Sequence, residues 1–159
     1  MSKEQPIGSL IVVVGKRGTG VSTELCHLSY AMKGREYYTL ITTAKPMNNP
    51  HIPNANHPSV SAIGLNGESA PLWSFLEESM HDKQVWLVID SAECFKNQDD
   101  AFDTINAIRE KGHHVLIGGL DGTLLIEKLV MVAQHIHPNN VRIVRPLCLK
   151  HGLFHEVCS

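Results

Sequence analysis

Residues 7–23 read IGSLIVVVGKRGTGVST, an apolar run followed by a glycine-rich turn. The five aliphatic residues Leu10 to Val14 predict a buried strand, which we place at Ile7–Val14. Ser22 and Thr23 offer N-cap side chains for the helix that follows. A strand, a glycine-rich turn and a helix in this order are the context in which backbone N–H groups cradle phosphate.

Short apolar runs alternate with helix-length amphipathic stretches along the rest of the chain. This alternation is typical of a parallel sheet that is covered by helices. Further strands are predicted at Tyr37–Thr43, Val60–Leu65, Val85–Asp90, Val115–Leu120 and Val141–Leu147, and further helices at Ser69–Met80, Asp99–Lys111 and Leu124–Gln134. The sequence therefore predicts an α/β fold with a parallel sheet and helices on both faces. His113 and His114 are expected at a solvated strand end.

Length and composition limit the classes of protein to which the chain can belong. With 159 residues and no repeat or linker, residues 1–159 are expected to form one domain. The formal net charge of -2 supplies no basic field for nucleic acid or an anionic membrane. No apolar run approaches the ~20 residues of a membrane span, and four scattered cysteines are too few for a disulfide framework. We therefore expect a protein of a reducing compartment such as the cytoplasm, without nucleic-acid or membrane partners.

The glycine-rich turn keeps the frame G-x-x-x-x-G-x-[ST] of a phosphate-binding loop. The candidate phosphate-binding residues are Gly15, Lys16, Arg17, Gly18, Thr19, Gly20, Val21, Ser22 and Thr23. In such loops a lysine follows the last glycine and reaches the β- and γ-phosphates, but here Val21 takes its place. Lys16 or Arg17 is the candidate replacement. The alternative is that the glycines only build a tight turn.

Two aspartates follow buried strands of the predicted sheet. Asp90 ends the strand Val85–Asp90, at the carboxyl edge where open α/β sheets place ligands. In P-loop proteins an aspartate at this point holds Mg²⁺, although a strand-end aspartate also serves as a turn or helix cap. Asp121 lies in the turn Leu120 to Thr123 (LDGT), which we expect at the same edge. Both aspartates join the candidate cofactor-binding residues.

Four motifs together resemble the type II thymidine kinases. That family carries GPMFSGKSTEL, DEGQFF, ALDGTFQRKPF and a C-x-x-C, in this order. The corresponding stretches here are Gly15 to Leu25 (GKRGTGVSTEL), Asp90 to Phe95 (DSAECF), Gly119 to Leu129 (GLDGTLLIEKL) and Cys148 to His151 (CLKH). The resemblance covers nearly the whole chain from Ile7 onward. It implies a P-loop NTPase-like sheet, with phosphoryl transfer from ATP to thymidine as the family's activity.

The chain differs from the family at the positions of the family's general base and nucleoside pocket. The family's general base is a glutamate directly after the strand-end aspartate; Ser91 stands there, and Glu93 is the candidate substitute. Leu124 to Leu129 replace the FQRKPF stretch that helps to form the nucleoside pocket. The chain ends before the family's thymine-binding lasso, so we expect a fold truncated ahead of the lasso and zinc region. Apart from these two positions we assign no catalytic residue.

The tail contains four possible zinc ligands, namely Cys148, His151, His155 and Cys158. Cys148 and His151 lie where the family has its first zinc pair. Only three residues separate the two pairs, whereas about a dozen separate them in the usual finger. A zinc site is one interpretation of this tail, and a buried cysteine with surface histidines is the other.

Three hypotheses for function follow from these observations. The first is a catalytically inactive thymidine kinase-like domain, kept as a scaffold or binding subunit of a larger assembly, with protein partners or self-association and no required cofactor. The second is an active nucleoside kinase that uses Lys16 or Arg17 and a displaced base. The third is a regulator that holds ATP or GTP with Mg²⁺ through the loop and Asp90 without turning it over.

Overall fold

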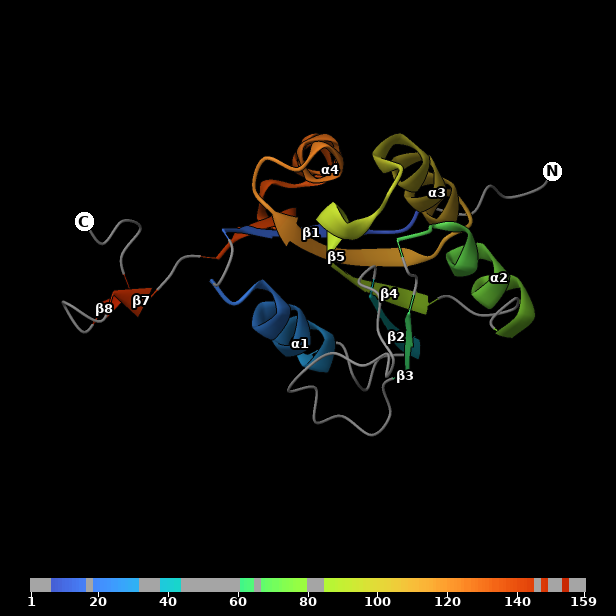
Figure 1. Ribbon diagram of the computed structural model, residues 1–159, viewed down its shortest axis with the longest axis horizontal. Coiled ribbons are helices and arrows are strands. Elements are labelled where there is room, and N and C mark those ends of the chain that lie inside the picture. The colour runs from blue at the N-terminus through green and yellow to red at the C-terminus, as the bar shows by residue number, and fades with distance from the viewer. Residues whose placement is uncertain are drawn as a thin grey trace.

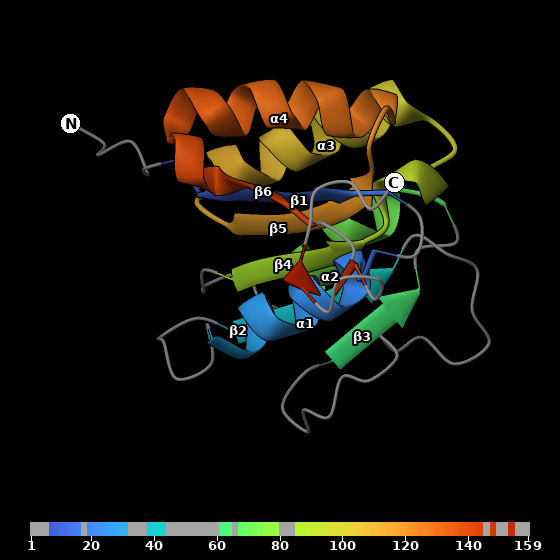
Figure 2. The same ribbon diagram turned by 90° about the vertical axis from the view of Figure 1, so that its left-hand side faces the viewer.

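A parallel sheet of six strands forms the centre of the molecule. The computed structural model describes residues 7–16, 19–31, 38–43, 61–64, 67–79, 85–144, 147–148 and 153–154. The strands lie in the order β3-β2-β4-β5-β1-β6, as Figure 2 shows. Their bounds are β1 Leu10–Gly15, β2 Tyr38–Thr43, β3 Ser61–Gly64, β4 Val85–Asp90, β5 His114–Leu120 and β6 Val141–Ile143. All five strand pairings in this sheet are parallel.

Helices cover both faces of the sheet (Figure 1). Helix α1 (Val21–Ala31) packs on one face. Helices α2 (Ala70–Ser79), α3 (Gln98–Glu110) and α4 (Leu124–Ile136) pack on the other. Short 3₁₀ turns are η1 (Ala92–Cys94) and η2 (Pro138–Asn140), and β7 (Leu147–Cys148) pairs with β8 (Leu153–Phe154) in a separate antiparallel ribbon. The predicted α/β architecture is confirmed.

Strand β1 supplies side chains to two hydrophobic cores. Leu10, Val12 and Val14 point into the core beneath α3 and α4, whereas Val13 joins Leu25 in the core beneath α1. Successive side chains of a strand point to opposite faces, so a strand that is covered on both sides must be apolar at every position. The uninterrupted aliphatic run that identified this strand is therefore a consequence of the two-sided covering.

Two consecutive glycines at the end of β5 let helices approach closely from both sides. A Cβ placed on Gly118 would lie 2.6 Å from Val21 Cγ1, at the start of α1. A Cβ on Gly119 would lie 2.7 Å from Ile126 Cγ1 of α4, on the opposite face. Because a side chain at either position would collide with a helix, the glycine pair brings the first turn of α1 close to the ends of the central strands.

The first strand begins later than the sequence predicts. Ile7 is 64% exposed, and β1 starts only at Leu10. The backbone N–H groups ahead of it find other partners, because Gly8 N donates to Arg109 O (2.8 Å) and Ser9 N donates to His114 Nδ1 (2.8 Å). The predicted strand Val141–Leu147 is also shorter, since β6 ends at Ile143.

His113 and His114 are half-buried and do not form the solvated strand end that the sequence suggested. The His114 ring stacks on Trp86 with a centroid separation of 4.8 Å, and its Nδ1 accepts the hydrogen bond from Ser9 N. Burial lowers the pKa of His114 below its ordinary 6.5, and the neighbouring His113 lowers it further. Burial also lowers the pKa of His113.

These shifts predict that the protein loses stability as the pH falls below about 6.5. Below that pH the unfolded histidines bind protons that the folded ones do not. The free energy of unfolding therefore becomes smaller as the pH falls. Well above pH 6.5 neither state is protonated and the effect vanishes. Urea unfolding at about pH 7.5 and about pH 5.5 measures the loss. His114→Gln should make this loss of stability smaller, whereas His135→Gln, at an exposed site on α4, should leave it unchanged. If the His114→Gln variant loses as much stability as the unaltered protein, His114 is not a source of the pH dependence.

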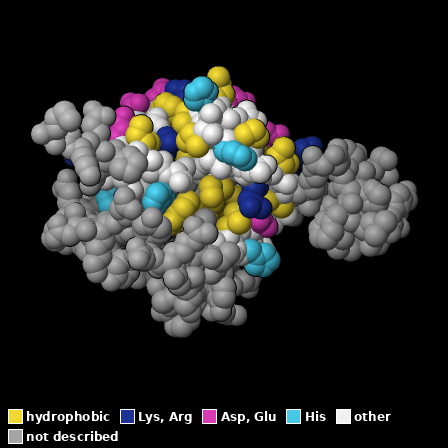
Figure 3. Space-filling view, turned by 180° about the vertical axis from the view of Figure 1, so that it is seen from behind, with side chains coloured by type: hydrophobic (Ala, Val, Ile, Leu, Met, Phe, Trp, Pro, Cys, Tyr) yellow, Lys and Arg dark blue, Asp and Glu magenta, His cyan; other side chains and the backbone are white. Residues whose placement is uncertain are grey.

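On the face drawn in Figure 3, Asp and Glu side chains of the described residues lie along the upper edge. Lys and Arg side chains of the described residues are scattered over this face among hydrophobic and histidine side chains. Within the described part of the chain, no helix is both long enough and apolar enough to span a membrane.

Candidate phosphate-binding site

A cavity of about 440 Å³ opens where β1, β4 and β5 end and α1 begins. The strand register brings these ends together, because Gly15 pairs with Leu120 and Asp90 pairs with Gly118. The helix after β1 covers one face of the sheet, and the helices after β4 and β5 cover the other. Where the chain leaves neighbouring strand ends toward opposite faces of the sheet, a crevice forms, and open α/β sheets bind ligands in such crevices.

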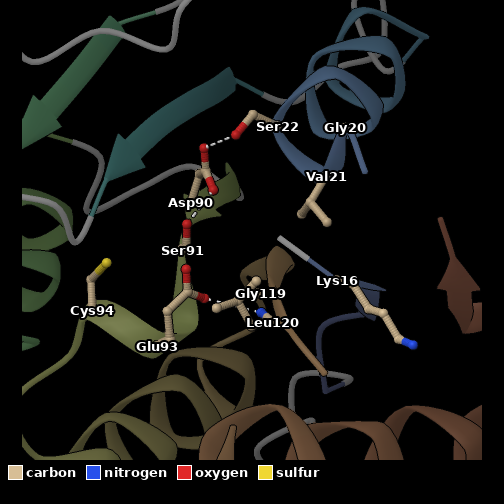
Figure 4. A pocket seen from close by; sticks show the side chains of 10 residues that line it. All are labelled: Lys16, Gly20, Val21, Ser22, Asp90, Ser91, Glu93, Cys94, Gly119 and Leu120. Carbon is tan, nitrogen blue, oxygen red and sulfur yellow. Dashed lines mark hydrogen bonds between the residues drawn. The ribbon is translucent and has the colours of Figure 1, made fainter. Parts of the chain in front are cut away.

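The cavity brings together residues from three separate motifs (Figure 4). Of the residues predicted to bind a cofactor, Lys16, Gly20, Val21, Ser22 and Asp90 line it, together with Ser91 and Glu93. Gly15 lies buried at the end of β1, while Thr23 and Asp121 are exposed and Thr19 is half-buried, all outside the lining. Arg17 and Gly18 lie outside the described residues. For the residues outside the lining, a role in binding stays a prediction.

The turn between β1 and α1 ends at Gly20, directly before the first residue of the helix. Gly20 has φ +94°, a region that glycine enters without strain, and its carbonyl accepts the first helical hydrogen bond, from Glu24 N at 3.0 Å. Ser22 and Thr23 therefore lie inside the first turn of α1, and their predicted N-cap role is wrong. The displacement leaves the Ser22 side chain free to face the sheet.

Ser22 and Asp90 meet across the edge of the cavity. Ser22 Oγ donates to Asp90 Oδ2 at 2.5 Å, and Ser91 Oγ donates to Asp90 Oδ1 at 2.6 Å. Asp90 is only 4% exposed, and a buried carboxylate is stable only when its oxygens accept hydrogen bonds. Two residues that lie 68 positions apart are thus joined by a hydrogen bond between the first turn of α1 and the end of β4.

Val21 turns onto the sheet. Its Cγ1 and Cγ2 lie over Gly118 and Gly15, at 2.6 Å and 2.8 Å from where their Cβ atoms would be. Its half-buried side chain packs on the core that contains Val13 and Leu25. The position at which the sequence frame calls for a lysine is therefore filled by an aliphatic group that packs on the sheet.

Glu93 and Gln98 hold the wall of the cavity in place. Glu93 Oε1 accepts from Leu120 N at 3.0 Å, which fastens η1 to the end of β5. Gln98 Nε2 donates to Ala92 O (3.1 Å) and Phe95 O (2.8 Å), and its Oε1 accepts from Leu125 N (3.1 Å). One oxygen of Glu93 thus serves the fold, while its catalytic use as a substitute base stays a prediction.

Sequence reasoning missed several residues of this site. Cys94, Gly119 and Leu120 also line the cavity, and Gln98 supports it from behind. The glycine pair Gly118–Gly119 at a strand end could have indicated a close approach of backbone and helix. The contact of Gln98 with Leu125 joins residues 27 positions apart, and no local pattern predicts it.

The proposed zinc ligands lie largely outside the described residues. Cys148 belongs to β7, which pairs with β8 so that its backbone lies opposite Leu153. His151, His155 and Cys158 are not among the described residues, so the zinc site stays a prediction. Within the described residues, no group of three or more His, Cys, Asp or Glu side chains is arranged to hold a metal ion.

The parallel sheet, the glycine turn and the Ser–Asp pair define a P-loop NTPase-like α/β fold. The chain is similar to the flagellar accessory protein FlaH from Methanocaldococcus jannaschii, with a TM-score of 0.51 and 16% sequence identity over 82% of this chain and 69% of that one. At this identity the likeness concerns the fold. No protein-family model and no curated protein matches the sequence.

Proposed function

We propose that this chain is a catalytically inactive thymidine kinase-like domain that binds a nucleoside triphosphate with Mg²⁺ and acts as a binding subunit. The contact between Ser22 Oγ and Asp90 Oδ2, at 2.5 Å beside the turn after β1, is the observation that carries the proposal. It supports binding because the serine and the aspartate are present and in contact, whereas Val21 and Ser91 stand where the thymidine kinase family has its lysine and its general base.

The residues present fit a magnesium ion. A serine hydroxyl and a carboxylate are hard oxygen donors, and Mg²⁺ is commonly held by one or two carboxylates together with substrate phosphates. Ser22 and Asp90 would hold it, and the ion would supply positive charge beside the β- and γ-phosphates. The side chains of both residues face the cavity, so a phosphate chain there lies next to them.

Three features argue against phosphoryl transfer to thymidine. Val21 supplies no charge to the phosphates. Ser91, at the position of the family's general base, is 4% exposed and donates its hydroxyl proton to Asp90, so it is no base for a substrate hydroxyl. Leu125 and Leu129, in the stretch that corresponds to the family's nucleoside-facing segment, are completely buried in the core under α4.

Thermal unfolding with Mg-ATP, together with a thymidine phosphorylation assay, tests the proposal. Mg-ATP at 100 times its Kd should stabilise the native state by about 2.7 kcal/mol and raise Tm. Asp90→Asn should abolish the rise, and the matched change Asp103→Asn, at an exposed site on α3, should keep it. Thymidine phosphorylation by the unaltered protein should not exceed the background of Asp90→Asn.

Two results would contradict the proposal. If Mg-ATP leaves Tm unchanged, the turn is a purely structural one. If thymidine is phosphorylated and Lys16→Ala removes the activity, the domain is a kinase in which Lys16 has replaced the P-loop lysine, since Lys16 also lines the cavity.

A further inference from the structure

The outer surface of α3 is acidic. Every exposed residue of this helix carries a carboxylate, namely Asp99, Asp100, Asp103 and Glu110. Arg109, the one cation of the helix, does not offset them at the surface, because it is 6% exposed and its guanidinium donates to Gly8 O and Asn106 Oδ1. The Asp and Glu side chains along the upper edge of Figure 3 lie on the side of the molecule where Figure 1 places α3 and α4.

Helix α4 lies beside α3, and Lys128 joins the two helices (Figures 1 and 2). Lys128 Nζ donates to Asp99 Oδ1 and lies 5.3 Å from the centroid of the Phe102 ring. Lys128 is the one lysine of α4, and Glu127 adds another exposed carboxylate. The cations of both helices are thus engaged in contacts within the fold, so the surface of the pair is negative.

The same surface exposes apolar side chains of α4. Leu124 is 46% exposed and Met131 is 73% exposed. Residues three, four and seven positions apart share one side of a helix, so Leu124 and Met131 lie on the side of α4 from which Lys128 reaches α3. The surface along the two helices therefore combines carboxylates from α3 with an apolar row from α4.

This combination excludes several kinds of ligand. Nucleic acid and anionic membranes would meet charge of their own sign. A second copy docked by the same surface about a two-fold axis would set carboxylates against carboxylates. Within the described part of the chain, no three or more His, Cys, Asp or Glu side chains are grouped to hold a metal ion. A polypeptide that carries both positive charge and apolar side chains is complementary to the surface.

We propose that α3 and α4 form a docking surface for a basic amphipathic helix of a partner protein. Its apolar side packs on Leu124 and Met131, and its lysine and arginine side chains lie beside Asp103 and Glu110. A groove between neighbouring helices accepts a helix whose apolar residues recur every three or four positions. None of these four residues lines the cavity at the ends of β1, β4 and β5, so the inference does not depend on nucleotide binding.

Fluorescence anisotropy with a labelled synthetic peptide and the full chain tests this surface. The probe is a designed helix with leucines at every third or fourth position on one side and lysines beside them. One control peptide has glutamates in place of the lysines, and another has serines in place of the leucines. We expect each control to bind at least about tenfold more weakly than the probe. The Kd of the probe should rise about fivefold between about 50 mM and about 300 mM NaCl, because salt screens exposed charges.

Variants of the protein locate the binding. Met131→Gln should weaken binding of the probe about tenfold, because an apolar contact is lost. Asp103→Asn combined with Glu110→Gln should weaken it about fivefold, as expected for two exposed ion pairs. Two matched controls should leave the Kd unchanged: Ile143→Gln, at a 63% exposed site on the edge strand β6, and Glu24→Gln, on α1 at the opposite face of the sheet.

Four results would overturn the inference. The probe fails to bind, or the glutamate peptide binds as well as the probe. Ile143→Gln weakens binding as much as Met131→Gln, which would mean that the peptide adheres to any exposed apolar side chain. Analytical ultracentrifugation shows a dimer that Met131→Gln dissociates, which would assign the surface to a second copy of this chain.

Discussion

Substitution of Val21 by lysine should tighten the binding of Mg-ATP by about 10- to 100-fold. A charge-assisted contact contributes about 1.5–3 kcal/mol, and each 1.4 kcal/mol is a factor of about ten in Kd. The methylene stem of lysine can cover Gly118 as valine does, while its ammonium group extends toward the phosphates. Calorimetry with Mg-ATP on Val21→Lys and on Val21→Met measures the gain that is due to charge. Equal affinities in the two variants would show that the turn does not present phosphates to position 21.

Addition of Ser91→Glu to Val21→Lys should still not produce thymidine phosphorylation. Ser91 is 4% exposed and hydrogen-bonded to Asp90. A glutamate at this position would therefore place two carboxylates side by side in a buried site, where their negative charges repel each other. Leu125, Ile126 and Leu129 of α4 are buried in the core, which leaves the thymidine without the positioning on which catalysis depends. A radiolabelled thymidine assay decides, and thymidylate formed by the double variant would show that a nucleoside pocket persists.

The aliphatic runs of the sequence predicted the central strands because these strands are covered on both faces. Val85–Asp90 agrees with β4 at both ends, and His114 alone was missed from β5. Such runs carry no information on which strand lies beside which. That β5 separates β1 from β4 depends on contacts between distant segments, and it determines how Asp90 reaches the cavity.

Local preferences failed where tertiary contacts offered other partners. Ser22 has good N-cap chemistry, yet Gly20 precedes the helix because a positive φ is needed there, and Ser22 bonds Asp90 instead. His114 ends a strand and is polar, yet its ring stacks on Trp86. In both cases the partner lies far away in the sequence, so residue preference alone could not reveal it.

The sequence predicted part of the candidate site. The glycine frame and Asp90 predicted a phosphate site at the ends of β1 and β4, and the structure brings Ser22 and Asp90 into contact there. The packing of Val21 and the anchoring of Glu93 on Leu120 N were not predictable, because each depends on where the end of β5 lies.

Gly8 joins the start of β1 to the end of α3. Gly8 N donates to Arg109 O at 2.8 Å, and Arg109 Nε donates back to Gly8 O at 3.0 Å. Arg109 is only 6% exposed, although its guanidinium is charged, and Nη1 also donates to Asn106 Oδ1. These contacts hold the Gly8 backbone against the turn that contains His113, where no space remains for a side chain.

Gly8→Ala should lower the free energy of unfolding by about 2–4 kcal/mol, a large share of the about 5–15 kcal/mol of a typical domain. A Cβ on Gly8 would lie 1.7 Å from His113 O, so the backbone must move and the paired bonds with Arg109 must lengthen or break. Gly122→Ala is the matched control, since Gly122 has φ +89° and nothing within 4 Å of an added Cβ, so only the conformational cost of about 1 kcal/mol is expected there. Urea unfolding of both variants measures the difference. A loss in Gly8→Ala no larger than that in Gly122→Ala would mean that the segment ahead of β1 moves aside without affecting the fold.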